Sequence, residues 1–128
     1  MPIQKINQKS VSHVNYKNYK NLEKELKRIL KIIIKKYQPE KIILFGSLAN
    51  NNIHEGSDID LIVIKESSKR YFDRVDELIH LIHPREALDL FVLTPQEVQG
   101  ALDEENPYYE EIINKGEVLY EKTGSSMA

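Results

Sequence analysis

The sequence of 128 residues contains no cysteine and no tryptophan. Without cysteine it has no disulfide framework, no thiol nucleophile and no cysteine-based zinc or iron–sulfur site. Its apolar runs, such as Leu61-Ile62-Val63-Ile64, are far shorter than the roughly 20 residues that cross a bilayer, and the N-terminus lacks the apolar core of a signal peptide. These absences predict a soluble, cytoplasmic protein with no membrane partner.

Neither sign of charge predominates, because the chain has 18 Lys and Arg and 20 Asp and Glu, a net charge of −2. This balance argues against a general polyanion-binding surface, so nucleic acid is not an expected partner. The balance hides a split: residues 1–41 carry a net charge of +8 and residues 42–128 a net charge of −10. Much of the positive charge lies on one predicted helix face, which is either a solvated face or a docking surface for an acidic partner (Lys24, Lys27, Lys31 and Lys35).

The length predicts one domain, with a flexible N-terminal arm over 1–17, a folded domain over 18–122 and a flexible tail or cloning scar over 123–128. The expected fold class is α/β (α+β), a small mixed β-sheet with helices packed on it. Apolar runs predict strands over 41–45, 58–64, 87–93 and 117–120, and helical periodicity predicts helices over 18–38, 67–82, 95–102 and 107–114.

Several local signals refine these boundaries. Pro39 ends the first helix, and Thr94 with Glu97 forms a capping box at the start of the third. In the second helix Ser67 or Ser68 is the expected N-cap, and Phe72 is expected on the buried face.

Two carboxylates open the second predicted strand. Asp58 and Asp60 point to the same face because side chains in a strand alternate, and a hard divalent cation such as Mg²⁺ is their natural partner. An EF-hand loop would need Gly where Val63 stands. The carboxylate pairs of haloacid-dehalogenase phosphatases and of many glycosyltransferases follow an apolar strand, whereas this pair precedes one. The remaining alternative is a pair of exposed acids that open an edge strand of the sheet.

A third carboxylate, Asp89, interrupts the next apolar strand, where an isolated charge has no structural use. If the first two strands are antiparallel and the helix over 67–82 makes a parallel crossover, Asp89 comes level with Asp58 and Asp60. Gly46 and Ser47, at the end of the first strand, then lie beside them. Gly lets backbone approach an anion closely, Ser adds a hydroxyl, and a short helix is expected to begin near Leu48.

Gly46-Ser47, ten intervening residues, Asp58-Ile59-Asp60 and the later Asp89 resemble the signature of the DNA polymerase β-like nucleotidyltransferase superfamily. In size the chain is similar to its minimal nucleotidyltransferases. The resemblance implies that Asp58 and Asp60 hold two Mg²⁺ ions across a nucleoside triphosphate, most simply ATP, whose phosphates Gly46 and Ser47 grip. It also implies that Asp89 completes one metal site and helps to deprotonate the acceptor hydroxyl. Many minimal members follow Gly-Ser with an Arg-Ala-Arg run, where this chain has Leu48-Ala49-Asn50-Asn51.

Minimal members are typically paired with a helical HEPN protein. In toxin–antitoxin pairs the nucleotidyltransferase is the antitoxin and transfers AMP to a tyrosine of its partner. The resemblance therefore implies a protein adenylyltransferase that works in a homo- or hetero-oligomer. Two alternatives stay open: a binding module that neutralises a helical partner by contact alone, and a small-molecule nucleotidyltransferase of the aminoglycoside type.

Overall fold

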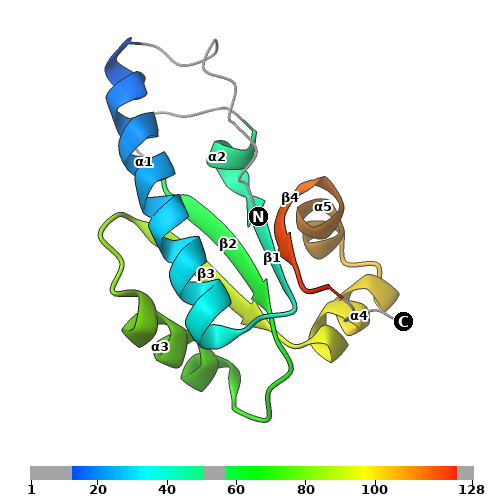
Figure 1. Cartoon of the computed structure of the whole chain (residues 1–128). Helices are drawn as coiled ribbons and strands as arrows, with labels where there is room; N and C mark the ends of the chain where they lie inside the picture. The colour runs from blue at the N-terminus through cyan, green and yellow to red at the C-terminus, as the bar shows by residue number, and fades with distance from the viewer. Residues whose placement is uncertain (1–12, 51–56, 124–128) are drawn as a thin grey trace.

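A four-stranded mixed sheet forms the centre of the computed structural model, which describes residues 13–50 and 57–123 (Figure 1). Its strands are β1 (Lys41–Phe45), β2 (Ile59–Ile64), β3 (Leu88–Leu93) and β4 (Glu117–Glu121), in the order β3-β2-β1-β4. Strand β1 pairs antiparallel with β2 and with β4, whereas β2 pairs parallel with β3. The predicted mixed sheet and its strand directions are confirmed.

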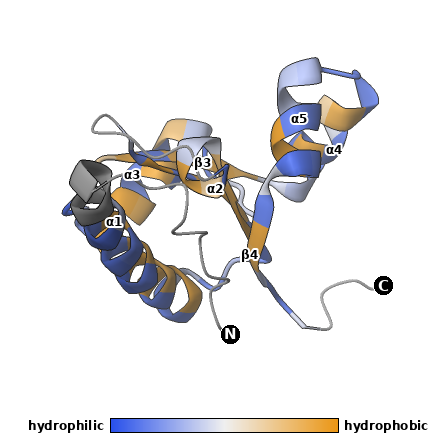
Figure 2. Ribbon diagram, turned by 90° about the horizontal axis from the view of Figure 1, so that it is seen from above, coloured by the Kyte–Doolittle hydropathy of each residue, from blue (hydrophilic) through white to orange (hydrophobic). Residues whose placement is uncertain are grey.

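Helices lie on both faces of this sheet (Figure 2). On one face pack α1 (His13–Ile32), its π-helical continuation η2 (Ile33–Tyr37) and α3 (Tyr71–Ile82). On the other face lie α4 (Pro95–Asp103) and α5 (Pro107–Lys115), while the one-turn α2 (Gly46–Ala49) directly follows β1. This arrangement confirms the α/β (α+β) fold class.

Strand β2 explains how the sheet is stabilised. All six of its residues are buried, because it has a neighbouring strand on each side and material on both faces. A strand in that position needs a nearly continuous apolar sequence, which Leu61–Ile64 supplies. Asp60 is therefore the exception within it.

The two faces are covered to different extents. The face under α1 and α3 carries the larger apolar core, in which residues such as Leu26, Leu61 and Leu78 are almost completely buried. The face under α4 and α5 carries a smaller cluster, with Ile43, Ile62 and Ile112 at its centre. We call these the closed face and the half-open face.

Helix α1 starts earlier and ends differently from the prediction. It begins at His13 instead of near Asn18, and its last turn is the π-helix η2, which ends where Gln38 adopts a left-handed conformation (φ 53°) before Pro39. The rest of the predicted arm (1–12) and most of the predicted tail (124–128) lie outside the described residues. The four lysines of the predicted basic face are exposed, Lys24, Lys27 and Lys31 on α1 and Lys35 on η2, as both interpretations of that face require.

Helix α3 corrects two predictions. It begins at Tyr71 with Arg70 as N-cap, so neither Ser67 nor Ser68 caps it; the Ser67 hydroxyl accepts a hydrogen bond from the Lys69 N–H in the preceding turn. Phe72 is 82% exposed. The buried face is centred on Leu78, and at about 100° per residue Phe72 lies roughly 120° around the helix from it.

A polar network joins α3 to α4. The predicted capping box is present, with the Thr94 hydroxyl accepting from the Glu97 N–H and the Glu97 carboxylate accepting from the Thr94 N–H. The same carboxylate accepts two hydrogen bonds from the buried Arg74 guanidinium, at 2.7 and 3.0 Å. Arg74 also donates to the Val92 carbonyl and so ties α3 to β3 as well.

No helix within 13–50 or 57–123 has the length and apolar character of a membrane span.

Candidate active site

Three carboxylates meet at one end of the half-open face. Asp60 and Asp89 are direct register partners in the parallel β2–β3 pair, and Asp58 stands just before β2. One oxygen from each of the three side chains lies within 4.8 Å of the others. The structure therefore brings together the three acidic residues that the sequence singled out, and the parallel crossover through α3 is what aligns them.

Their electrostatics are unfavourable for a bare cluster. Asp60 is only 8% exposed, and its pKa is raised to about 7, first by burial and then by the negative charges of Asp58 and Asp89. A buried carboxylate with two carboxylate neighbours is costly for folding unless a cation balances the charge. Within the described residues no lysine or arginine forms an ion pair with this acidic triad.

The donor set fits a hard divalent cation. Mg²⁺ prefers oxygen ligands and is usually held by one or two carboxylates together with substrate phosphates. The triad offers several such oxygens on a rigid strand pair, with Asp89 exposed to solvent and Asp60 buried behind it. Asp58, Asp60 and Asp89 are thus the residues that could hold Mg²⁺.

Gly46 lies against the triad in a conformation that requires glycine. Its φ angle is 75°, and a Cβ atom placed on it would come within 2.1 Å of Asp60 Oδ2. Because Phe45 pairs with Asp60 in the β1–β2 register, the turn into α2 passes directly over the Asp60 carboxylate. The missing side chain lets the Asp60 carboxylate lie directly against the backbone of this turn.

Ser47 also lies at this end of the sheet, and its contact reveals a residue that sequence reasoning missed. The Ser47 hydroxyl donates to the Ser57 hydroxyl at 3.1 Å, and Ser57 is buried directly before Asp58. This hydrogen bond joins the start of α2 to the start of β2. The signal available in the sequence was a second small hydroxyl residue adjoining the paired carboxylates.

The residues after Ser47 do not supply a cation. Leu48 is fully buried in the core of the closed face, Ala49 packs against that core, and exposed Asn50 is the C-cap of α2. Asn51 lies outside the described residues.

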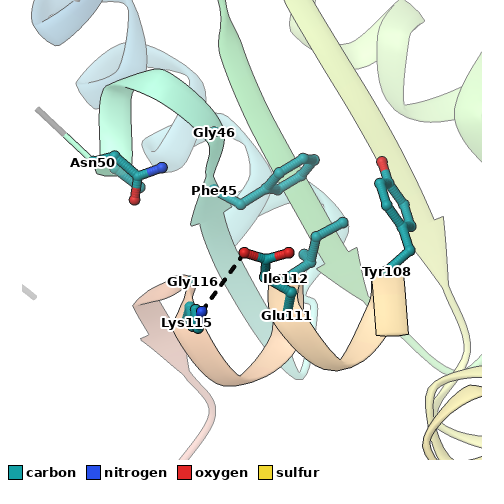
Figure 3. Close-up of a pocket in the computed structure, with 9 residues that line it drawn as sticks. Phe45, Gly46, Asn50, Tyr108, Glu111, Ile112, Lys115 and Gly116 are labelled. Atoms are coloured by element: carbon teal, nitrogen blue, oxygen red, sulfur yellow. Dashed lines mark ion pairs between the residues drawn. The ribbon is translucent and has the colours of Figure 1, made fainter. Parts of the chain in front are cut away.

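A hollow of about 220 Å³ has Gly46 in its lining (Figure 3). It lies between the end of β1, α2 and α5. The described residues that line it are Phe45, Gly46, Ala49, Asn50, Tyr108, Glu111, Ile112, Lys115 and Gly116. Nothing in the sequence marked α5 as part of the site, because its residues are distant from the acidic motif along the chain.

Comparison with known families settles which kind of domain carries this site. The family "Polymerase beta, Nucleotidyltransferase" matches residues 25–124, which is more than half of the chain. The chain belongs to this nucleotidyltransferase family. Membership supports a transferase, and it agrees with the family that the Gly-Ser and Asp-x-Asp motifs indicated.

A solved structure supports the fold of this nucleotidyltransferase domain. A crystal structure from Sulfolobus solfataricus, of a protein described as a nucleotidyltransferase, is similar with a TM-score of 0.57. The match covers 73% of this chain and 81% of the other, at 22% sequence identity, so it bears on the fold alone. Among curated proteins, none matches the chain.

Proposed function

We propose that this nucleotidyltransferase transfers a nucleoside monophosphate, AMP from ATP, to a hydroxyl group of a partner protein. The observation that carries the proposal is the triad itself: three carboxylates within 4.8 Å on the half-open face, beside a glycine whose φ angle and close contact with Asp60 disfavour any side chain. A cluster that costs folding energy at the edge of an apolar sheet is typical of a functional site.

Each residue has a defined task in this proposal. Asp58 and Asp60 would hold two Mg²⁺ ions, with Asp89 completing one of the two metal sites. Bound there, Mg²⁺ supplies charge stabilisation for the attacking and leaving oxygens of an in-line displacement. Gly46 would let the backbone of the turn approach phosphate oxygens closely, and Ser47 would contact them.

The transfer balances as follows. The acceptor oxygen forms a bond to the α-phosphorus, and the bond from the α-phosphorus to the bridging oxygen of the β-phosphate breaks. Pyrophosphate leaves with that electron pair. The acceptor proton passes to the carboxylate of Asp89, which is the exposed member of the triad and so meets an incoming hydroxyl first.

The position of Asp89 supports a large acceptor. It lies on β3, an edge strand of the sheet, and its side chain is exposed. A side chain of another protein could reach it directly from solvent. We propose a helical protein of the HEPN type as this partner and an antitoxin role for this chain; the tyrosine hydroxyl of such a protein is the acceptor that this chemistry suits.

A labelling experiment tests the proposal. The protein, Mg²⁺, ATP labelled in its α-phosphate and the protein encoded beside it are incubated together, and the partner is analysed by mass spectrometry. We expect the partner to gain one AMP group. The Asp58→Asn and Asp60→Asn variants should each lose more than about 100-fold in rate, which exceeds the usual cost of disturbing an outer partner of a metal ligand. Asp73→Asn, at an exposed position on α3, is the matched control.

Other outcomes point to the alternatives. A folded complex that stays unlabelled with every nucleoside triphosphate would contradict the proposal. Neutralisation of the partner that survives Asp58→Ala combined with Asp60→Ala would favour a binding module. A labelled small molecule and an unlabelled partner would favour the aminoglycoside type of transfer.

A further inference from the structure

The hollow between α2 and α5 shares Gly46 with the surroundings of the acidic triad. Gly46 forms one wall of the hollow and also lies against Asp60, while Phe45, another wall residue, is the register partner of Asp60. A ligand long enough to extend past Gly46 would therefore reach from the hollow to Asp60.

The chemistry of the hollow is mixed. Its lining includes the apolar side chains of Phe45 and Ile112, and Figure 3 shows the Glu111 and Lys115 side chains of α5 paired beside them. Lys115 is the one basic side chain among the described residues that line it. At about 220 Å³ the hollow is smaller than the ~300 Å³ at which pockets begin to hold a whole drug-sized ligand, so it suits one end of a nucleotide.

The order of the strands indicates which end that is. Asp89 is on β3, Asp60 on β2 and Gly46 follows β1, and the strands stand in the order β3-β2-β1-β4. The hollow is thus on the opposite side of Asp60 from Asp89. In an in-line displacement the attacking and leaving oxygens lie on opposite sides of the phosphorus. If the acceptor is deprotonated at Asp89, the leaving group points across Gly46 toward the hollow.

We propose that this hollow binds the departing pyrophosphate, with Lys115 as the cation that holds it. The inference rests on the proposed nucleotidyl transfer and assigns its leaving group to α5. An ammonium group is a common binder of phosphate oxygens. The α2 residues that line the hollow, Ala49 and Asn50, carry no charge, so Lys115 of α5 is the cation available there.

The ion pair between Lys115 and Glu111 fits this role. Their charged atoms are 3.7 Å apart, and their side chains are 77% and 69% exposed. An exposed pair of this kind is weak, so a phosphate group could take the place of Glu111 at Lys115. The Glu111 carboxylate would then repel the phosphate, which lets product leave after the transfer.

Calorimetric titration of inorganic pyrophosphate in the presence of Mg²⁺ tests the proposal without any transfer reaction. We expect Lys115→Gln to weaken pyrophosphate binding about tenfold, the size of one charge-assisted hydrogen bond. Lys115→Arg should keep most of the affinity, and Glu111→Gln should tighten binding because it removes a repelling charge. Lys27→Gln, on the exposed face of α1, should leave binding unchanged.

A parallel titration with AMP distinguishes a pyrophosphate site from a nucleoside site in the hollow. AMP binding should not depend on Lys115. The proposal is overturned if the wild-type protein does not bind pyrophosphate, if Lys115→Gln binds it as tightly as the wild type, or if Lys115→Gln loses AMP binding to the same degree, which would place the nucleoside in the hollow. A Lys115-dependent pyrophosphate site in a protein that labels no partner would leave this inference standing and contradict the protein acceptor.

Discussion

The two faces of the sheet share the same strands and differ in what their side chains do. On the closed face, α1 and α3 bury a large apolar core built from alternate residues of the strands. On the half-open face, the residues that alternate with them include Asp60 and Asp89, and the apolar cluster under α4 and α5 is smaller. The closed face therefore accounts for most of the stability, which allows the other face to carry charges that oppose folding.

This division lets stability and function be changed separately. A substitution on the closed face should alter the free energy of unfolding at every condition. A substitution in the triad should abolish function and slightly raise the free energy of unfolding, as is common where active sites are strained.

The largest effect on stability is expected in the core of the closed face. Leu61 is completely buried in the central strand, so Leu61→Ala should lower the free energy of unfolding by about 2–5 kcal/mol. Phe45 is half-buried on the other face, with its ring centroid 5.8 Å from that of Phe91. Phe45→Leu should therefore lower the free energy of unfolding by only about 1 kcal/mol. Urea unfolding of both variants measures the contrast, and equal losses would contradict it.

Gly46→Ala should come next. A positive φ costs a non-glycine residue about 1–2 kcal/mol, and the clash with Asp60 Oδ2 adds to it, so we expect a loss of about 2–4 kcal/mol together with loss of transfer. Gly100→Ala is the matched control. Gly100 is within α4 with open space where a Cβ would stand, so alanine there should stabilise the protein by about 0.5–1 kcal/mol. Thermal unfolding that ranks the two variants in the reverse order would refute this account of Gly46.

The link between α3 and α4 should contribute less and should depend on pH. Hydrogen bonds from Arg74 are the main cause that lowers the pKa of Glu97 from 4.5 to about 2. Because the pKa of Glu97 is lowered in the folded state, its carboxylate stabilises the fold fully above about pH 4.5, and this stabilisation is lost as the pH falls toward 2. Allowing for the 43% exposure of the Glu97 side chain, Glu97→Gln should cost about 1–2 kcal/mol at pH 7.

Unfolding by urea at pH 7 and at pH 3 checks this prediction. The difference between wild type and Glu97→Gln should shrink at the lower pH. Glu77→Gln, which removes an exposed partner of Lys69, is the control and should cost about 1 kcal/mol or less. A difference for Glu97→Gln that stays constant with pH would show that the capping role of Glu97, and not its charge, matters.

Most of the site could be predicted from the sequence because it depends on local periodicity and on one topological choice. Asp58 and Asp60 are on one face because side chains in a strand alternate. An antiparallel strand pair followed by a parallel crossover then places Asp89 level with them. The capping box at Thr94 is likewise a local pattern.

What could not be predicted depends on contacts distant in sequence. The hollow needs α5 to pack beside the end of β1, and Arg74 becomes buried only because α4 brings Glu97 to it. The exposure of Phe72 shows the same limit: apolar spacing predicted a buried face, but the sheet selected the face centred on Leu78. The apolar spacing of α3 allowed more than one buried face, and packing against the sheet determined which one is buried.

The central claim is that the acidic triad exists to hold cations and does not help the protein to fold. The most direct test is the free energy of unfolding of wild type and Asp60→Asn at pH 8, each with and without Mg²⁺. Without Mg²⁺, Asp60→Asn should be more stable by about 0.2–1 kcal/mol, because it removes a like charge directly opposite Asp89. Adding Mg²⁺ should stabilise the wild type and leave the variant unchanged. A variant that is less stable than the wild type, with Mg²⁺ stabilising both equally, would contradict the account.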